Sequence, residues 1–553
     1  MAVTETAVTE AAVTEAAVTE AAVAEAASGK ATAGRTVVQD ASAARAAHEG
    51  ILRRQSARES AARTYARALP IVPVRARGLT IEGADGRRYL DCLSGAGTLA
   101  LGHNHPVVLE AIRKVLDSGA PLHALDLATP VKDAFITELF RTLPPGLAGH
   151  ARVQFCGPAG TDAVEAAFKL VRAATGRSEL LAFAGAYHGM TSGALEASGH
   201  ASDVRVARLP YPQDYRCPFG VGGPQGAELA ARWTESVLDD PKSGVPLPAG
   251  MILEPVQGEG GVLPAPDDWM RRMRQITADR SIPLIADEVQ TGVGRTGAFW
   301  AVEHSGITPD VMVLSKAIGG SLPLAVVVYR DDLDVWEPGA HAGTFRGNQL
   351  AMAAGTATMA YVRENALTER AAALGTRMLN QLRLLAEEFP VIGDVRGRGL
   401  MIGVEMVEPV EMVDSEGWGV GAGPGRGGGV VVGGVDECGE GGGGGGSRAG
   451  GGAGSPVSGA PGAGGVGSLR PRLPRPASPA LAAAVQRECL RRGLIVELGG
   501  RHSSVVRLLP PLTITDEQAT AVLDRLADAV AAVARNHVPG SGRQQQRRRR
   551  SGG

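Results

Sequence analysis

The stretch that decides the fold is Ile282-Pro283-Leu284-Ile285-Ala286-Asp287-Glu288-Val289-Gln290, together with the later stretch Asp310-Val311-Met312-Val313-Leu314-Ser315-Lys316. Each contains a short apolar run of the length expected for a parallel strand that is covered on both faces. A helical pattern over residues 267–276 precedes the first run, so strands and helices alternate. The pattern predicts an α/β fold in which Asp287 and Lys316 follow the carboxyl ends of two strands, where open sheets bind their ligands.

A glycine-rich turn lies upstream, in Phe155-Cys156-Gly157-Pro158-Ala159-Gly160-Thr161-Asp162-Ala163. A strand is expected over 151–155, and the apolar residues of 164–171 recur with the spacing of one helix face. Gly160 and Thr161 then stand at the N-terminus of that helix, where free N–H groups and the helix dipole favour a phosphate dianion. An ordinary capped helix start is the structural alternative.

The segment Ala184-Gly185-Ala186-Tyr187-His188-Gly189-Met190 follows another expected strand, 180–183. An aromatic ring beside glycines at a strand end can lie flat against a planar cofactor. Taken alone, Tyr187 would be read as a core aromatic residue and His188 as a buried polar residue with its hydrogen bonds satisfied.

These features suit one kind of chemistry when they occur together. Pyridoxal phosphate is held as a Schiff base on a lysine amine, and its ring accepts electrons while the ring nitrogen is protonated beside a carboxylate. Lys316, Asp287, the phosphate-binding turn and Tyr187 supply these parts. Alone, Lys316 could be a solvated loop residue and Asp287 a helix cap, so the interpretation depends on the combination.

Six motifs in this order resemble the class III, or ω-type, aminotransferases. They are Gly160-Thr161-Asp162-Ala163, Tyr187-His188-Gly189, Glu254-Pro255-Val256-Gln257-Gly258-Glu259-Gly260-Gly261, Asp287-Glu288-Val289-Gln290-Thr291-Gly292, Lys316, and Gly343-Thr344-Phe345-Arg346-Gly347-Asn348. The resemblance runs from about Tyr65 to about Arg535. It implies the type I fold of pyridoxal-phosphate transferases: a large domain with a mostly parallel sheet and helices on both faces, and a small α+β domain from N- and C-terminal segments.

The resemblance also implies roles for single residues. Lys316 would hold pyridoxal 5′-phosphate and move the proton, and Asp287 would contact the ring nitrogen. The other cofactor-binding positions would be Gln290 near the ring oxygen, Tyr187 stacked on the ring, His188, and Gly160 and Thr161 at the phosphate. Thr344 would reach the phosphate of the neighbouring subunit, which implies a homodimer with shared active sites.

Two further residues concern the substrates. In this family an arginine at the position of Arg507 grips the α-carboxylate of glutamate or 2-oxoglutarate, and a planar guanidinium suits a carboxylate better than a lysine does. Glu259 matches the carboxylate that pairs with this arginine when the other substrate is bound. Without the resemblance, Arg507 could belong to a surface salt bridge and Glu259 to a loop.

Within the family, several phrases resemble diaminobutyrate–2-oxoglutarate aminotransferases, among them Thr344-Phe345-Arg346-Gly347-Asn348-Gln349 and Glu497-Leu498-Gly499-Gly500-Arg501. Ornithine aminotransferases would be expected to carry a tyrosine about where Ala96 stands. The reaction implied is transamination between L-2,4-diaminobutanoate and 2-oxoglutarate. Enzymes for 4-aminobutyrate, acetylornithine, ornithine or lysine, and a non-catalytic cofactor-binding homologue, remain alternatives.

The composition fits a globular enzyme, since the 553 residues are 44% hydrophobic and carry a formal charge of −2. Nothing in it points to nucleic acid as a partner. The five cysteines form no CxxC pair and no cluster with metal-ligand spacing, so no metal site and reduced thiols are expected. No stretch approaches the ~20 apolar residues of a membrane span. These features favour a cytoplasmic protein that does not bind membranes.

The expected organisation has six parts. A disordered repeat tail (1–48) precedes the N-terminal segment of the small domain (49–120) and the large cofactor-binding domain (121–365). The C-terminal small domain (366–409 and 478–538) is interrupted by a glycine-rich disordered insertion (410–477), and a basic tail (539–553) ends the chain. The basic tail could bind polyanions or simply be solvated. Within the small domain, 494–498 and 505–509 are expected to form a hairpin, followed by a helix with Thr515 and Gln518 as a capping box.

Overall fold

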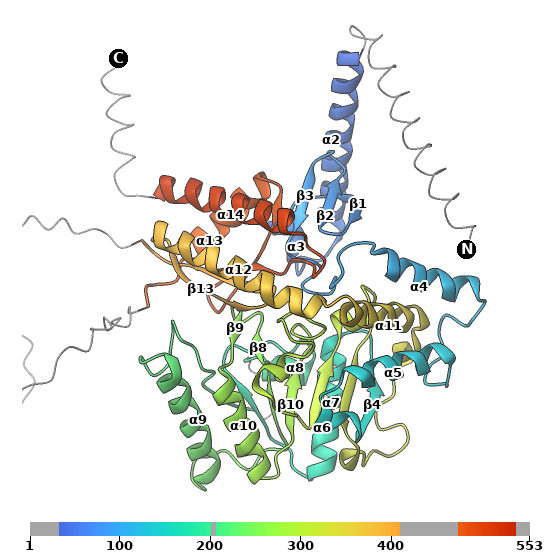
Figure 1. The fold of residues 1–553 in the computed structure, drawn as a ribbon, viewed down its shortest axis with the longest axis vertical. Helices are drawn as coiled ribbons and strands as arrows, with labels where there is room; N and C mark the ends of the chain where they lie inside the picture. The colour runs from blue at the N-terminus through green and yellow to red at the C-terminus, as the bar shows by residue number, and fades with distance from the viewer. Residues whose placement is uncertain (1–32, 201–205, 410–473, 538–553) are drawn as a thin grey trace, which may run out of the picture. The chain divides into compact units, whose positions relative to one another are not determined.

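The computed structural model describes residues 33–200, 206–409 and 474–537. Its largest sheet has seven strands, and only β12 runs antiparallel to both of its neighbours. The predicted mostly parallel sheet is therefore confirmed (Figure 1). In spatial order the strands are β4 (Ala151–Phe155), β12 (Val326–Arg330), β11 (Val311–Leu314), β10 (Leu284–Asp287), β7 (Gly250–Leu253), β5 (Leu180–Phe183) and β6 (Val206–Leu209).

Helices cover both faces of this sheet because successive strand residues point to opposite sides. In β10, Leu284 and Ala286 pack in one apolar core, while Ile285 packs in a second core on the other face. Helices α5 (Pro130–Thr142), α10 (Asp267–Asp279) and α11 (Gln349–Glu364) belong to the first core. Helices α7 (Gly160–Thr175) and α8 (Ser192–Ala197) belong to the second.

The ends of these helices follow local rules. Gly176 closes α7 with a φ of 67°, a left-handed conformation that glycine adopts without strain. The Asn348 side chain accepts a hydrogen bond from the Ala351 N–H and so caps α11. Helix α9 (Gly223–Asp239) lies beside α10, as Figure 1 shows.

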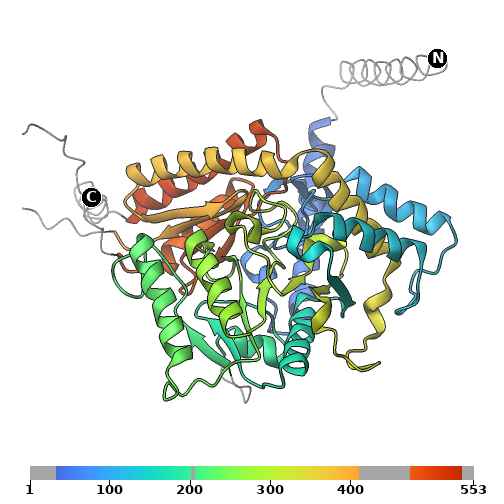
Figure 2. The ribbon, with the colours of Figure 1, turned by 60° about the horizontal axis from the view of Figure 1, so that its bottom comes forward.

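Two smaller sheets are built from segments that are far apart in the sequence. One has the order β1 (Pro73–Arg77), β2 (Thr80–Gly83), β3 (Arg88–Asp91) and β15 (Leu494–Ile495). The other has the order β13 (Ile392–Arg398), β14 (Met401–Met406), β17 (Val505–Leu508) and β16 (Glu497–Gly499). Helices α12 (Leu367–Glu388) and α13 (Pro479–Arg491) pack on the second sheet, and α14 (Asp516–His537) packs on these two helices; Figure 2 shows this region from another side.

The remaining elements are short or peripheral. They are α2 (Ala33–Arg58), α3 (Tyr65–Ala68), α4 (Pro106–Asp117), α6 (Pro145–Ala148), β8 (Val256–Gln257), β9 (Leu263–Pro264), η1 (Ala301–Ser305), η2 (Lys316–Gly319), η3 (Asp331–Leu333) and η4 (Thr344–Gly347). In the described parts of the chain, no helix is both long and apolar enough to cross a membrane.

Several expectations need correction. Residues 494–498 are predicted to form one strand of a hairpin, but they are divided between two strands. The first, β15, joins β3 in the first small sheet, and only the second, β16, pairs with β17. The repeat tail was expected to reach residue 48, but α2 begins at Ala33. The insertion was expected to reach residue 477, yet Glu408 N–H already donates to Pro476 O over 3.0 Å. Pro476 and Ala477 are therefore paired with the end of the preceding described segment, contrary to the expectation from composition.

Other parts of the expected organisation stand differently. The Thr515–Gln518 capping box is confirmed, because each side chain accepts a hydrogen bond from the other residue's backbone N–H. Residues 1–32, 410–473 and 538–553, which include most of the expected tails and insertion, lie outside the described residues. The division of the remainder into a large and a small domain stays a prediction.

Candidate active site

A cavity of about 340 Å³ lies at the carboxyl ends of the central strands. Most of the residues singled out in the sequence line it. They are Gly160, Thr161, Tyr187, His188, Glu259, Asp287, Gln290 and Lys316. The sheet therefore brings together side chains from five separate segments, each of which ends or follows a strand or begins a helix.

Lys316 is separated from the end of β11 by Ser315 alone. It is the first residue of η2 and has a φ of 52°. A side chain in this left-handed region is strained, so the surrounding structure must hold it there. Burial is the largest influence on the amine and lowers its pKa; the Glu259 carboxylate raises the pKa and the Arg507 charge lowers it. The net effect is a lowered pKa, which gives a larger fraction of neutral amine.

Asp287 is the last residue of β10, and its Oδ2 lies 2.7 Å from His188 Nδ1. Burial by itself lowers the pKa of His188, but the hydrogen bond and charge of Asp287 and the charge of Glu254 outweigh it and raise the pKa. The raised pKa of His188 favours the protonated imidazole beside the Asp287 carboxylate.

Glu254 is a third buried ionisable group in this network. Its two carboxylate oxygens accept hydrogen bonds from Tyr187 N–H and Gly258 N–H, each over 2.9 Å. Burial raises the pKa of Glu254 to about 7, against the opposing effect of His188. Glu254 thus ties the Tyr187 loop to the following loop while carrying a proton for part of its time at neutral pH.

The N-terminus of α7 has the features of an anion site. The Asp162 side chain accepts from Ala159 N–H, the residue before the helix, whereas no side chain in the described chain caps the N–H groups of Gly160 and Thr161, which open the helix beside the cavity. A Cβ on Gly189 would lie 2.3 Å from Thr161 Oγ1, so the Tyr187 loop can approach the helix only with glycine here. Thr161 Oγ1 and Thr191 Oγ1 lie 2.6 Å apart.

Gln290 and Tyr187 both line the cavity. Gln290 Nε2 donates to Ala96 O over 3.1 Å, whereas its buried Oε1 has no protein partner among the described residues. The Tyr187 side chain is 43% exposed in the single chain, which leaves a ring face available to a planar ligand. His188 Nε2 is a second buried atom without a protein partner in the described chain.

Arg507 is fully buried in β17, although it does not itself line the cavity. Its Nη2 donates to Glu259 Oε1 over 2.6 Å and lies 2.5 Å from Glu497 Oε2. Burial by itself lowers the pKa of the Arg507 guanidinium, but Glu259 and Glu497 raise it. The guanidinium therefore stays positively charged. It contacts Glu259, which lines the cavity.

Thr344 is the one candidate that the single chain leaves apart from the others. It begins the short helix η4, is exposed, and is not among the residues that line the cavity. Its expected role needs a second subunit and stays a prediction.

The residues present fit pyridoxal phosphate on three observations. A helix N-terminus at which no side chain caps the N–H groups of Gly160 and Thr161 suits the phosphate, and the buried Asp287 carboxylate beside His188 suits a protonated ring nitrogen. The amine of Lys316, with its lowered pKa, lies in the same cavity.

Sequence reasoning missed two residues of this site, Glu497 and Tyr65. Glu497 stands directly opposite Arg507 in the β16–β17 ladder, and Tyr65 donates a hydrogen bond to Glu497 Oε1 over 2.8 Å. The hairpin register would have paired Glu497 with Arg507. Nothing in the sequence connects Tyr65 to a residue that lies so far along the chain.

The chain was compared with known proteins. The family described as aminotransferase class-III matches residues 61–435. A diaminobutyrate–2-oxoglutarate aminotransferase of Rhizobium meliloti is 49% identical over 503 residues, which cover 90% of this chain and 94% of that protein. A protein of the same name from Haemophilus influenzae is 40% identical, with 90% and 98% covered.

Among solved structures, the PLP-bound form of an amine transaminase from an uncultivated Pseudomonas species has a TM-score of 0.66 and 27% identity. The match covers 86% of this chain and 98% of that one. Together with the family match, this assigns pyridoxal phosphate as the cofactor. The chain belongs to the class III aminotransferases, the pyridoxal-phosphate enzymes that its six motifs resemble.

Proposed function

We propose that this enzyme transfers the 4-amino group of L-2,4-diaminobutanoate to 2-oxoglutarate, yielding L-aspartate 4-semialdehyde and L-glutamate in a reversible reaction. The observation that carries the proposal is buried Arg507, held 2.6 Å from Glu259 beside the Lys316 cavity. One pocket must accept an amine donor in one half-reaction and a dicarboxylate in the other. The names of the relatives support diaminobutanoate as the donor.

When bound, pyridoxal phosphate supplies an electron sink and stores the amino group between the two half-reactions. Lys316 would hold the cofactor and then take a proton from the substrate carbon that bears the reacting nitrogen. An amine whose pKa is lowered by burial is free to accept that proton. Asp287 would keep the ring nitrogen protonated, supported by its 2.7 Å contact with His188.

The other cofactor contacts follow from where the groups stand. Gly160 and Thr161 would bind the phosphate at the start of α7, and the unpartnered Gln290 Oε1 would face the polar substituent of the ring. Tyr187 would stack on the ring, and the His188 side chain would orient Asp287. Thr344 would complete the phosphate site of the partner subunit.

Arg507 and Glu259 would act as an exchangeable pair. With Glu259 in contact, the guanidinium is covered by this carboxylate in addition to Glu497, which suits an amine donor. When Glu259 turns away, the guanidinium is exposed to the carboxylate of glutamate or 2-oxoglutarate, for which its planar donors are well shaped. The Glu259 side chain is 33% exposed, so it has room to move.

The assembly and compartment are also part of the proposal. We infer a homodimer with shared active sites, supported by the exposed position of Thr344 at a distance from its own cavity. We infer a cytoplasmic location, which the buried free thiols of Cys92, Cys156 and Cys489 support because such thiols persist in reducing compartments.

A single half-reaction tests the proposal. The purified protein is loaded with pyridoxal phosphate, and the visible absorbance of the bound cofactor is followed as L-2,4-diaminobutanoate is added without a keto acid. We expect the absorbance to be lost and then restored by 2-oxoglutarate.

Other outcomes would replace the substrate or the activity. Loss of absorbance only with 4-aminobutyrate, acetylornithine, ornithine or lysine would keep the mechanism and overturn the donor. No response to any amine would identify a non-catalytic homologue. Ala96, whose carbonyl accepts from Gln290, stands where an ornithine enzyme would be expected to carry tyrosine, which argues against ornithine.

A further inference from the structure

Arg507 contacts a second carboxylate, and this contact differs from the one with Glu259. Glu497 lies opposite Arg507 in adjacent antiparallel strands, and its Oε2 is 2.5 Å from Arg507 Nη2. Directly opposed residues in such a ladder are held at a fixed spacing. The side chain of Glu497 is only 8% exposed, against 33% for Glu259. Glu259 sits on a turn, so it can leave Arg507 while Glu497 cannot.

The hydrogen bonds of Glu497 are incomplete. Tyr65 donates to Oε1 over 2.8 Å, whereas the buried Oε2 has only its ion pair with Arg507, which is not a well-aligned hydrogen bond. A carboxylate oxygen can accept more than one hydrogen bond, so Oε2 can take a further donor from a ligand while it stays paired with Arg507. A ligand group that completes Glu497 must donate hydrogen bonds and is favoured if it carries positive charge.

The charges of Arg507, Glu259 and Glu497 also favour a ligand with a positive charge. With Glu259 in place, two carboxylates face the single guanidinium of Arg507. Burial and the Glu259 charge raise the pKa of Glu497, so a further cation nearby would favour the charged form of this carboxylate. The charges of Glu497 and Lys316 also influence each other, so the cluster lies close to the reacting amine. In this state the site suits a substrate that carries a cation at the end away from Lys316.

We propose that Glu497, positioned by Tyr65, binds the α-ammonium group of the diamino acid donor and so selects it over amines that lack this group. The inference rests on the proposed function, in which the 4-amino group is placed at Lys316. The α-ammonium is then the only cation left on the donor. Glutamate reacts through its own α-amino group and has no second cation, so Glu497 adds nothing to that half-reaction.

The test compares two donors that differ by this one group. L-2,4-diaminobutanoate and 4-aminobutanoate present the same terminal amine and carboxylate, but only the first has the α-ammonium. The measured quantity is the ratio of their kcat/KM values in the wild-type holoenzyme and in Glu497→Gln. Loss of a charged hydrogen bond predicts that the ratio falls about 10- to 100-fold in the variant.

Two further variants distinguish a change in donor selectivity from damage to the fold. Tyr65→Phe removes the hydrogen bond that holds Glu497 and should lower the same ratio by a smaller factor, without altering the buried charges. Glu488→Gln removes a carboxylate that pairs with Arg491 and Arg492 on α13 and should leave the ratio unchanged. The melting temperature of each variant is measured alongside, and calorimetric binding of both donors to each variant in a Lys316→Ala background gives a readout without turnover.

The outcomes separate the two proposals. A wild-type enzyme that prefers diaminobutanoate, with a Glu497→Gln variant that keeps this preference, overturns the role of Glu497 and leaves the proposed function standing. A wild-type enzyme that shows no preference for diaminobutanoate overturns both. If Glu497→Gln does not fold, an unchanged ratio in Tyr65→Phe overturns the inference.

Discussion

Lys316 has a strained backbone and an amine whose pKa is lowered by burial. Neither feature favours folding, so both indicate a functional role for this residue. Lys316→Ala should fold, since alanine removes the side chain from a strained position without adding bulk. Its turnover of diaminobutanoate with 2-oxoglutarate should fall by more than about a thousandfold, because the proton carrier is lost. Steady-state assays measure this, with circular dichroism for the fold and Lys169→Ala, an exposed lysine on α7, as the control. A fully active Lys316→Ala enzyme would sink the mechanism.

Arg507 allows the two half-reactions to be separated. Arg507→Lys keeps a positive charge beside Glu497 but loses the planar pair of donors that suits a carboxylate. We expect kcat/KM for 2-oxoglutarate to fall about 10- to 100-fold, and the donor half-reaction to fall much less. Single-turnover measurements of each half-reaction give the comparison, with the exposed Arg487→Lys as a matched control. Equal losses in both half-reactions would contradict a role in recognising the dicarboxylate.

At the residue level, the sequence pointed to the groups that follow strands and failed for groups that meet across the fold. Lys316 and Asp287 could be placed because each stands at or just past the end of a short apolar strand, and parallel strands end at the same edge. The hydrogen bond between Asp287 and His188 joins residues from different segments, so no spacing in the sequence predicts it. Glu254 was recognised only as part of a motif, because its raised pKa depends on burial.

Among the elements, the turn after β10 carries an acidic residue that is expected to make stability depend on pH. Glu288 is buried and accepts hydrogen bonds from Thr291 and from Val302 N–H. Burial raises its pKa from the ordinary 4.5 to about 7, against those hydrogen bonds. The folded protein therefore keeps this proton up to about pH 7, whereas the unfolded chain releases it near 4.5. Stability must then fall as pH rises through this window, by up to roughly 3 kcal/mol from this group.

Glu288→Gln tests this effect, because glutamine resembles the protonated acid and cannot ionise. The difference between the unfolding free energies at pH 5 and pH 8 should be smaller in the variant than in the wild type. Denaturant titrations at both pH values measure it, and Glu228→Gln on the exposed face of α9 serves as the control. Identical pH profiles for wild type and Glu288→Gln would show that Glu288 is ionised in the folded protein.

Helix α14 offers a test of a local signal that was read correctly. The Thr515 hydroxyl accepts a hydrogen bond from Gln518 N–H, and the Gln518 side-chain oxygen accepts one from Thr515 N–H. Thr515→Ala should lower the free energy of unfolding by about 1 kcal/mol. Thr520→Ala, within the same helix, removes only a hydroxyl bonded to Asp516 O and should have little effect in the same denaturation experiment. Equal effects of the two substitutions would mean that the cap contributes nothing specific.

The expected elements failed where pairing is non-local. The strands 494–498 and 505–509 have the pattern of a hairpin, but β15 ends at Ile495 and pairs with β3, some four hundred residues earlier in the chain. Similarly, β12 is as apolar as its neighbours, and nothing in its sequence marks it as antiparallel. Apolar runs and caps predict that an element exists, while the partner of a strand is decided by the packing of the whole domain.

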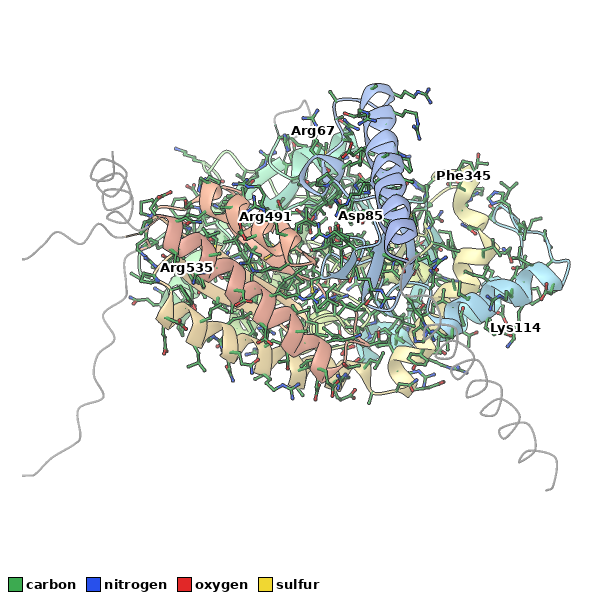
Figure 3. The ribbon with its side chains drawn as sticks, turned by 90° about the horizontal axis from the view of Figure 1, so that it is seen from above. Arg67, Asp85, Lys114, Phe345, Arg491 and Arg535 are labelled. Carbon is green, nitrogen blue, oxygen red and sulfur yellow. The ribbon has the colours of Figure 1, made fainter. Side chains whose placement is uncertain are left out.

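At the scale of the whole molecule, the described chain exposes large apolar side chains in two segments that lie against each other. Phe345 is 67% exposed and Leu127 is 66% exposed, and Figure 3 labels Phe345 on the outside of the ribbon. Ala124 N–H donates to Gly347 O over 3.1 Å, and Arg346 Nη2 lies 2.7 Å from Asp126 Oδ2, so the two segments form one surface. Grouped apolar side chains on a surface are typical of an interface. Thr344 lies within it, which supports the proposed dimer.

Subunit complementation gives the sharpest test of shared sites. A Lys316→Ala chain and a Thr344→Ala chain each carry one defect, and in a mixed dimer both defects should fall in the same active site. The other site then has the Lys316 of one chain and the Thr344 of its partner, and it is intact. If Thr344→Ala homodimers are strongly impaired, an equimolar mixture unfolded and refolded together should recover about a quarter of wild-type activity, since half of the dimers are mixed and each has one working site.

The matched control mixes Lys316→Ala with Asp287→Asn. Both of these residues line the cavity of their own chain, so a mixed dimer has one defect in each site and should recover no activity. Sedimentation or light scattering on the same samples establishes that dimers form. Recovery in the Thr344 mixture alone requires that Thr344 acts across the interface, because only then do the two defects segregate into one site. Without recovery in dimeric samples, Thr344 would belong to the site of its own chain, and the shared-site arrangement would be wrong.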